Sequence, residues 1–385
     1  MATNGGPNTI DDGLVLSLDA ANGKSFRGEP TENLFSDPDF DNVSGNWNNR
    51  TQYTSGGVDG GSFGGSTSTW SFYQNVNITS GKVYSISGYV RMPSNNSDVR
   101  INLDNNDLGN VYVDTNGQWT YFEYTTPPAT STRSERIYIL DRSKNNNEVQ
   151  ADKFQIEEKP YSTRFVNGTR GTTVSTGGGW ADISGNNNHG EIMNGVTTEN
   201  DSTAQGALEF DGVDDKVNGN WPDILNIDDS TTPRSWEVVF KPYTTGGQMG
   251  IFGYKAGSGC TYFCNGGIFI YNERITFNWY DNSNYRFLGD QVSLANTYYH
   301  VIATFDTDQI PRLYVNGKLD SSYNSPTNLN YSAGMRIFDI GWNSKNGGRD
   351  YFLGEISFVK FYKGKAFSPQ EVLQNYNATK SRFNL

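Results

Sequence analysis

The sequence is poor in the residues that bind metals, nucleic acids and membranes. Its 385 residues include 2 cysteines and 2 histidines, and 30 lysines and arginines stand against 42 aspartates and glutamates. A net charge of −12 offers no basic surface for a phosphate backbone, so we expect no nucleic-acid partner. No apolar run reaches the ~18 residues of a membrane-spanning helix, so we expect no membrane insertion. The start, MATNGGPNTIDDG, lacks the basic and apolar segments of a secretion signal, which predicts synthesis in the cytoplasm.

The cysteines and histidines do not form a metal-binding or catalytic motif. Cys260 and Cys264 lack a second pair of cysteine or histidine ligands, which argues against zinc. Their spacing is compatible with two free thiols or with one local disulfide. His189 lies in an asparagine-rich loop and His300 in a predicted strand, so we expect no Ser-His-Asp arrangement.

The residues that the sequence has in abundance are typical of β-structure. Aromatic residues make up 14% of the chain and glycine contributes 43 residues. Segments that alternate between apolar and polar residues, such as 83–90 and 312–315, are separated by turns of Gly, Asn and Asp. We therefore predict an all-β protein whose strands form sandwiches or barrels.

One short helix is predicted at the C-terminus. Ser368 is its expected N-cap, Pro369 follows in the first turn, and Glu371 completes a capping box. Val372, Leu373 and Tyr376 are expected to lie on one face of this helix.

Motifs in the second half of the chain are similar to those of a known fold. In chain order they are Trp180–Gly190, Leu208–Asp215, Tyr298–Asp306, Leu313–Lys318 and Leu353–Tyr362. Together they resemble the laminin-G-like, concanavalin A-type jelly roll, which implies two packed antiparallel sheets. In that family a strand like Gly13–Asn22 directly precedes the first of these motifs, whereas here a long segment separates the two.

The intervening segment is predicted to be a second domain inserted into the first. It lies between two polar joints, Lys24–Asn33 and Thr169–Gly179. Its motifs Asn33–Phe35, Gly117–Phe122 and Asp152–Glu158 resemble those of carbohydrate-binding-module jelly rolls. We predict an N-terminal arm over residues 1–11, the first strand of the laminin-G-like domain and a joint over 12–30, the inserted sandwich over 31–160, and the main jelly roll over 161–385.

Carboxylates decide between an enzyme and a binding protein, because concanavalin A-type folds also include glucanases. A retaining glycosidase needs two carboxyl groups about 5–5.5 Å apart on one face. Glu209, Asp211 and Asp214 superficially match the spacing of those enzymes, but Gly212 and the following aspartates predict a turn that breaks the face. We therefore predict no catalytic residue and no enzymatic activity.

The resemblance of the inserted domain implies one candidate metal site. It places Asp41 near the start and Asp152 on the last strand, where carboxylates in that family can hold a structural calcium ion. Lys153 stands where a second acid is common. The alternative is a pair of solvated or salt-bridged carboxylates, and no cofactor is required.

Aromatic residues beside polar loop residues are the candidate glycan-binding groups. A sugar needs a flat aromatic face against its apolar side and polar groups for its hydroxyls. For each candidate, packing in the core is the alternative. Trp119, Trp180 and Trp236 are interpreted as core residues. The candidate glycan-binding residues are Trp47, Trp70, Tyr73, Trp279, Tyr280, Trp342 and Arg349.

The combination of these modules with the C-terminal helix is similar to structural proteins of tailed bacteriophages. We predict a non-enzymatic virion surface protein, a capsid decoration, fibre or tail-associated component made in the host cytoplasm, that mediates adhesion to glycans or host surfaces. Its expected partners are other virion proteins and host surface polysaccharide. A homo-oligomer is expected, and a trimer by analogy with fibres. Two alternatives stay open: a polysaccharide-degrading enzyme or its targeting subunit, and a purely architectural virion protein.

Overall fold

The chain forms two compact units in the computed structural model. One contains Met1–Pro30 and Gly171–Leu385, and the other, Thr31–Arg170, is inserted into it in sequence. In the described part of the chain no helix is long and apolar enough to cross a membrane. The structure describes residues 8–26, 28–42, 47–67, 72–93, 98–103, 107–143, 145, 147–163, 165–198, 206–220, 232–256, 266–281, 284–327, 336–345 and 348–385.

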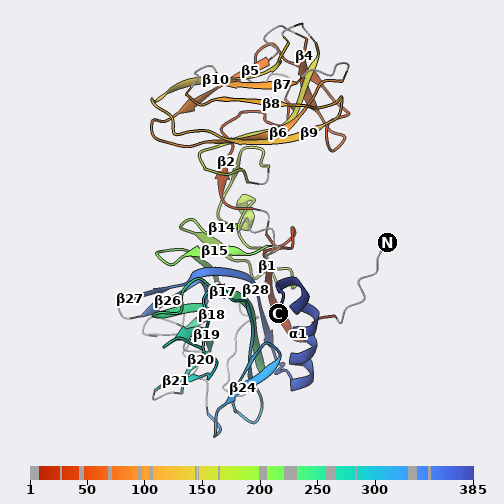
Figure 1. The fold of residues 1–385 in the computed structure, drawn as a ribbon. Helices are drawn as coiled ribbons and strands as arrows, with labels where there is room; N and C mark the ends of the chain where they lie inside the picture. The colour runs from red at the N-terminus through yellow and green to blue at the C-terminus, as the bar shows by residue number, and fades with distance from the viewer. Residues whose placement is uncertain are drawn as a thin grey trace. The chain divides into compact units, whose positions relative to one another are not determined.

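The larger unit is an antiparallel β-sandwich (Figure 1). Its first sheet contains β1 (Leu14–Asp19), β14 (Thr197–Thr198), β15 (Leu208–Asp211), β17 (Arg234–Pro242), β22 (Tyr299–Phe305), β23 (Arg312–Val315), β24 (Lys318–Ser322) and β28 (Leu353–Lys363). Its second sheet contains β13 (Glu191–Met193), β16 (Lys216–Asn220), β18 (Gln248–Ala256), β19 (Gly267–Tyr271), β20 (Arg274–Tyr280), β21 (Tyr285–Leu288) and β25 (Arg336–Ile340). A hairpin of β26 (Trp342–Lys345) and β27 (Gly348–Tyr351), a 3-10 turn η1 (Val174–Thr176) and the helix α1 (Pro369–Phe383) complete this unit.

The order of the strands explains why the segment before the insert belongs to the larger unit. The first sheet has the order β14-β15-β28-β17-β22-β23-β24, and β1 pairs with β28. The second has the order β13-β16-β25-β18-β19-β20-β21. Side chains of both sheets meet in one core, where Trp236 of β17 lies 4.9 Å from Phe277 of β20 between ring centroids. The predicted all-β sandwich fold is confirmed.

Helix α1 covers the outward face of the first sheet. Its capping box is formed as predicted, since Ser368 accepts from the Glu371 amide and the Glu371 side chain accepts from the Ser368 amide. Val372 is buried, whereas Leu373 is 47% exposed, because neighbouring positions of a helix lie about 100° apart. The cover explains why nearly every residue of β17 is buried, on both faces of the sheet.

The smaller unit is a second antiparallel sandwich of two sheets. One sheet, of order β5-β10-β7-β8, contains β5 (Phe72–Ile78), β7 (Val99–Leu103), β8 (Asn110–Val113) and β10 (Arg133–Asp141). The other, of order β3-β4-β11-β6-β9, contains β3 (Thr51–Tyr53), β4 (Phe63–Ser66), β6 (Ser85–Arg91), β9 (Thr120–Thr125) and β11 (Val149–Glu157). Two short strands, β2 (Thr31–Glu32) and β12 (Thr169–Arg170), pair with each other. With this pair of strands the smaller unit ends at Arg170, ten residues beyond the boundary expected at residue 160.

Candidate functional site

The outward face of the five-stranded sheet in the smaller unit carries aromatic side chains. Val90 of β6 and Phe122 of β9 point into the core, so their neighbours Tyr89 and Tyr121 point outward, and Tyr121 is 47% exposed. The outward face of a sandwich is ordinarily polar. Aromatic residues on this face therefore need an explanation other than core packing.

These aromatic residues form two groups of rings beside one guanidinium. Tyr53 stacks on Phe63 at 4.6 Å between ring centroids, and Trp119 meets Phe63 edge-on at 5.5 Å. The Arg91 guanidinium lies 4.5 Å from the centroid of the Trp119 ring. Tyr89 and Tyr121 are 5.2 Å apart between ring centroids. We call this surface the Trp119 face, and its members are Tyr53, Phe63, Tyr89, Arg91, Trp119, Tyr121, Glu148 and Gln150.

A chain of hydrogen bonds fixes the polar groups of the Trp119 face. The Tyr53 hydroxyl donates to Glu148 Oε1 at 2.8 Å, and Gln150 Nε2 donates to the same oxygen at 2.8 Å. Arg91 Nε donates to Gln150 Oε1 at 2.6 Å. The hydrogen bond to Glu148 raises the pKa of Tyr53, and burial lowers the pKa of Arg91. Rings and polar groups are thus held in one arrangement before any ligand arrives.

Small residues make room for these rings. A Cβ atom at Gly65 of β4 would lie 2.8 Å from the Tyr53 ring, so a larger residue there would displace the ring. Asn116 and Gly117 both have positive φ, and they form the turn that leads into Trp119. The Trp119 indole then donates to the carbonyl oxygen of Gly56 at 3.2 Å.

The Trp119 face offers the groups that recognise a sugar. Tyr53 and Trp119 are half-buried and Tyr121 is more exposed, so parts of their rings face solvent. An aromatic ring face can stack on the apolar side of a pyranose, and neighbouring amide, carboxylate and guanidinium groups can bond its hydroxyls.

The opposite sheet of the smaller unit has a second mixed face. Tyr73, Tyr138, Asn102 and Asn110 are directly paired across β5, β10, β7 and β8. The rings of Tyr73 and Tyr138 are 4.9 Å apart, and Asn102 Nδ2 donates to Asn110 Oδ1 at 2.7 Å. We call this the Tyr73 face, and Tyr112 of β8, 51% exposed, lies at its edge.

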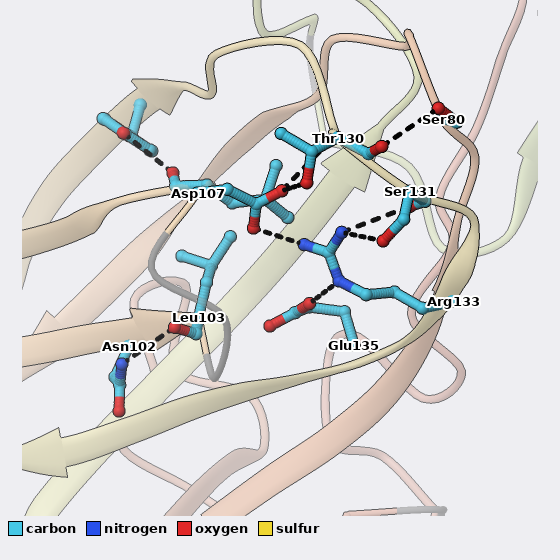
Figure 2. Close-up of polar contacts among 10 residues, drawn as sticks. Ser80, Asn102, Leu103, Asp107, Thr130, Ser131, Arg133 and Glu135 are labelled. Atoms are coloured by element: carbon cyan, nitrogen blue, oxygen red, sulfur yellow. Dashed lines mark hydrogen bonds and ion pairs between the residues drawn. The ribbon is translucent and has the colours of Figure 1, made fainter.

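An ion-pair cluster joins the end of the β7–β8 connection to β10, as Figure 2 shows. Arg133 bonds to Asp107 and to the buried Glu135, each at 2.6 Å. Asp107 also accepts from the amide and hydroxyl of Thr130, and the hydroxyl bond is the largest influence lowering the pKa of Asp107. This cluster fixes the end of the β7–β8 connection that leads to Asn110.

The structure separates the candidate residues that the sequence grouped together. Trp47 and Trp279 are 5% and 0% exposed and belong to the cores of their units, so they present no ring face to solvent. Tyr73 is half-buried in the Tyr73 face, and Tyr280 is half-buried at the end of β20.

Trp342 lies in a different environment from the two buried tryptophans. It is half-buried beside Tyr351, at 6.1 Å between ring centroids, with the Lys216 ammonium 4.4 Å from its ring centroid. Trp70, Cys260, Cys264 and the side chain of Arg349 lie outside the described residues.

Trp119 was interpreted as a core residue, but the structure places it on the outward face. The signal was present in the segment GQWTYFEY, where Trp119 and Tyr121 share one parity and Phe122 has the other. Trp180 and Trp236 are buried, at 0% and 1% exposure, as expected of core residues.

The two aspartates of the expected calcium site differ in their environments. Asp41 is exposed, whereas Asp152 is 1% exposed and its Oδ2 accepts from the Val58 amide at 2.7 Å. Lys153 pairs with Asp59 at 2.8 Å. In the described ranges, Asp41 and Asp152 do not fall in a cluster of three or more potential ligands.

Two carboxylates of the larger unit face each other across β15 and β28. Glu209 of β15 lies directly opposite Glu355 of β28 on the outward face. Glu355 is fully buried, accepts from the hydroxyls of Tyr243 and Tyr298, and pairs with Lys241. Glu355 is therefore held by neighbours within the fold.

Comparisons with known proteins give a family match and distant structural similarities. A search of curated proteins gives no match. Among solved structures, the receptor-binding domain of botulinum neurotoxin C/D mosaic serotype is 17% identical, with a TM-score of 0.41 over 51% of this chain and 48% of that chain. The binding domain of botulinum neurotoxin serotype D is also 17% identical, with a TM-score of 0.39 over 51% and 48%. The match therefore spans about half the length of those proteins. Residues 211–373 match the family model of the concanavalin A-like lectin/glucanases superfamily, to which this part of the chain is similar.

Proposed function

We propose that this protein is a non-enzymatic glycan-binding protein and that the Trp119 face is its binding surface. The observation that carries the proposal is the set of outward rings of Tyr53, Trp119 and Tyr121 beside a fixed chain of polar groups. A glycan satisfies both parts of this surface, because its rings have apolar faces and its edges carry hydroxyls.

Other ligand classes fit the Trp119 face less well. A net charge of −12 disfavours a nucleic acid. Protein–protein interfaces are depleted of glutamate, whereas Glu148 lies among the rings here. The lectin-type family match of the larger unit is compatible with a second carbohydrate site there.

The proposed setting is the surface of a virion. This part rests on the resemblance of the sequence motifs to structural proteins of tailed bacteriophages. In that setting the protein would be a capsid decoration, fibre or tail-associated component, bound to other virion proteins and to host surface polysaccharide. The non-enzymatic assignment is supported by the partners of Glu355 and by the turn that follows Asp211.

Retention of the purified full chain on host surface polysaccharide tests this function, with sugar release measured in the same samples. Tyr121→Ala should weaken binding about tenfold, the equivalent of ~1.4 kcal/mol for one lost ring contact. Tyr112→Ala is the matched control, because Tyr112 is 51% exposed against 47% for Tyr121 but lies on the other sheet. We expect it to change the affinity by less than about twofold.

Each other outcome identifies a different function. Loss of binding only in Tyr112→Ala would move the site to the Tyr73 face. Release of reducing sugar would show a polysaccharide-degrading enzyme. Binding to no polysaccharide of the host would overturn the glycan proposal and favour an architectural role.

A further inference from the structure

The turn between β15 and β16 gathers three carboxylates of the larger unit. Gly212 has a φ of +75°, which turns the chain directly after Asp211. Asp211 Oδ1 then accepts from the amides of Val213 at 2.7 Å and Asp214 at 3.2 Å. This tight turn brings the side chains of Asp214 and Asp215 back toward Asp211.

The three carboxylates lie close enough to share one ion. Asp211, Asp214 and Asp215 each contribute an oxygen, and these oxygens lie within 4.8 Å of one another. Among the residues that the structure describes, no lysine, arginine or histidine forms an ion pair with any of the three. Lys216, the nearest cation in sequence, lies over the Trp342 ring at 4.4 Å.

Asp215 supplies an independent sign that this cluster takes a ligand. It is 4% exposed, and its Oδ2 accepts from the Asp211 amide at 3.0 Å. Its Oδ1 is buried and, within the described ranges, has no hydrogen-bond partner. A buried carboxylate oxygen without a partner is costly, and a bound cation removes that cost. Burial, followed by the charges of Asp211 and Asp214, raises the pKa of Asp215 to about 7.

We infer that the Asp211, Asp214 and Asp215 carboxylates form a divalent-cation site with a preference for Ca²⁺. Calcium binds oxygen ligands at about 2.3–2.6 Å, so oxygens up to about 5 Å apart can share one ion, and the oxygens of this cluster meet that condition. Magnesium requires strict octahedral geometry and keeps several waters, so it is held less readily by a cluster of three protein carboxylates. The site is distinct from Asp41 and Asp152, which lie in the smaller unit, and it does not depend on glycan binding.

A bound ion would join the β15–β16 turn to the turn between β13 and β14. Asn194 of the latter donates from Nδ2 to the Asp214 carbonyl oxygen at 2.7 Å. A Cβ atom at Gly195 would lie 3.6 Å from Asp215 Oδ1, so this oxygen faces the same turn. The ion would therefore stabilise two loops at one edge of the larger unit.

Calcium titration of the EDTA-treated full chain tests the site. We expect ~1 mM Ca²⁺ to raise the Tm of the larger unit by about 2–4 °C and to give a calorimetric binding signal, with a smaller effect of Mg²⁺. Asp214→Asn should abolish both effects, because it removes one charged ligand while keeping the carbonyl oxygen that Asn194 binds. Asp290→Asn, a neutralisation of an exposed aspartate elsewhere in the same unit, should keep both.

Two results would overturn the inference. One is a wild-type protein whose Tm and heat of titration do not respond to Ca²⁺. The other is an Asp214→Asn variant that responds as the wild type does, because the ion would then bind elsewhere. Since neither readout involves a glycan, failure here leaves the proposed function untouched.

Discussion

In the larger unit the outward face of β17 and β28 lies under helix α1, whereas the outward face of β6 and β9 in the smaller unit has no helix over it in the described part of the chain (Figure 1). Both faces carry side chains that a solvated sheet does not normally place outward. Under the helix they are Glu237, Val239 and Phe358, and all three are almost fully buried. On the Trp119 face the rings of Tyr53, Trp119 and Tyr121 stay partly in solvent.

The partners of the two faces show what this difference means. Glu237 accepts from the Tyr362 hydroxyl at 2.8 Å and from Asn375 of the helix at 3.0 Å, and His300 Nε2 lies 2.8 Å from it. Its hydrogen-bonding capacity is met within the fold. An outward residue of this kind serves stability, while outward rings that the fold leaves uncovered are available to a ligand.

Removal of Glu237 should give the largest effect on stability. In Glu237→Ala the hydroxyl of Tyr362, the amide of Asn375 and the Lys360 ammonium at 3.9 Å lose their buried partner. We expect the free energy of unfolding of the larger unit to fall by about 3–5 kcal/mol in urea denaturation. Glu237→Gln keeps an acceptor and should lose less. A loss below about 1 kcal/mol in the alanine variant would contradict the role given to this contact.

The same carboxylate should make the larger unit sensitive to acid. Burial alone would raise the pKa of Glu237, but Lys360 and His300 outweigh it and lower the pKa from 4.5 to about 2. Because the folded-state pKa is the lower one, the stabilisation is complete above about pH 4.5 and is lost as the pH falls toward about 2. Urea unfolding at a series of pH values should show this loss in the wild type. The assignment would be contradicted if the difference in free energy of unfolding between wild type and Glu237→Gln did not change over this pH range.

The alternation of residues and the turn signals predicted strands of a sandwich or a barrel, and the resemblance to the concanavalin A-type jelly roll selected the sandwich. The spacing of Ser368 and Glu371 predicted the capping box of α1. Local sequence carries this information because strand and cap preferences act over a few residues. The exposed position of Leu373 was not predicted, since the face that a helix buries depends on the surface that it meets.

The candidate site was harder to predict, because polar neighbours in sequence do not report tertiary contacts. Trp47 has asparagines on both sides, yet its ring packs between Phe35 and Phe40 at 5.1 Å from each. Trp119 directly precedes the strand β9, whose Phe122 points into the core, yet Trp119 is half-buried beside Arg91 on the outward face. The spacing of Trp119 and Phe122 indicates an outward ring, because residues three apart in an extended chain point to opposite faces of the sheet. This spacing is informative only when it is known that Phe122 points into the core.

Tyr121→Ala should give the smallest effect on stability, and this sharpens the comparison with Glu237. Its ring contacts Tyr89 at 5.2 Å but is 47% exposed, so the free energy of unfolding should change by less than about 1 kcal/mol. The glycan affinity of the same variant should fall about tenfold. Urea denaturation and polysaccharide retention of one protein preparation measure both quantities. A variant that unfolds more easily but binds normally would show that the uncovered rings serve the fold, as Glu237 does, and that the two faces do not differ in kind.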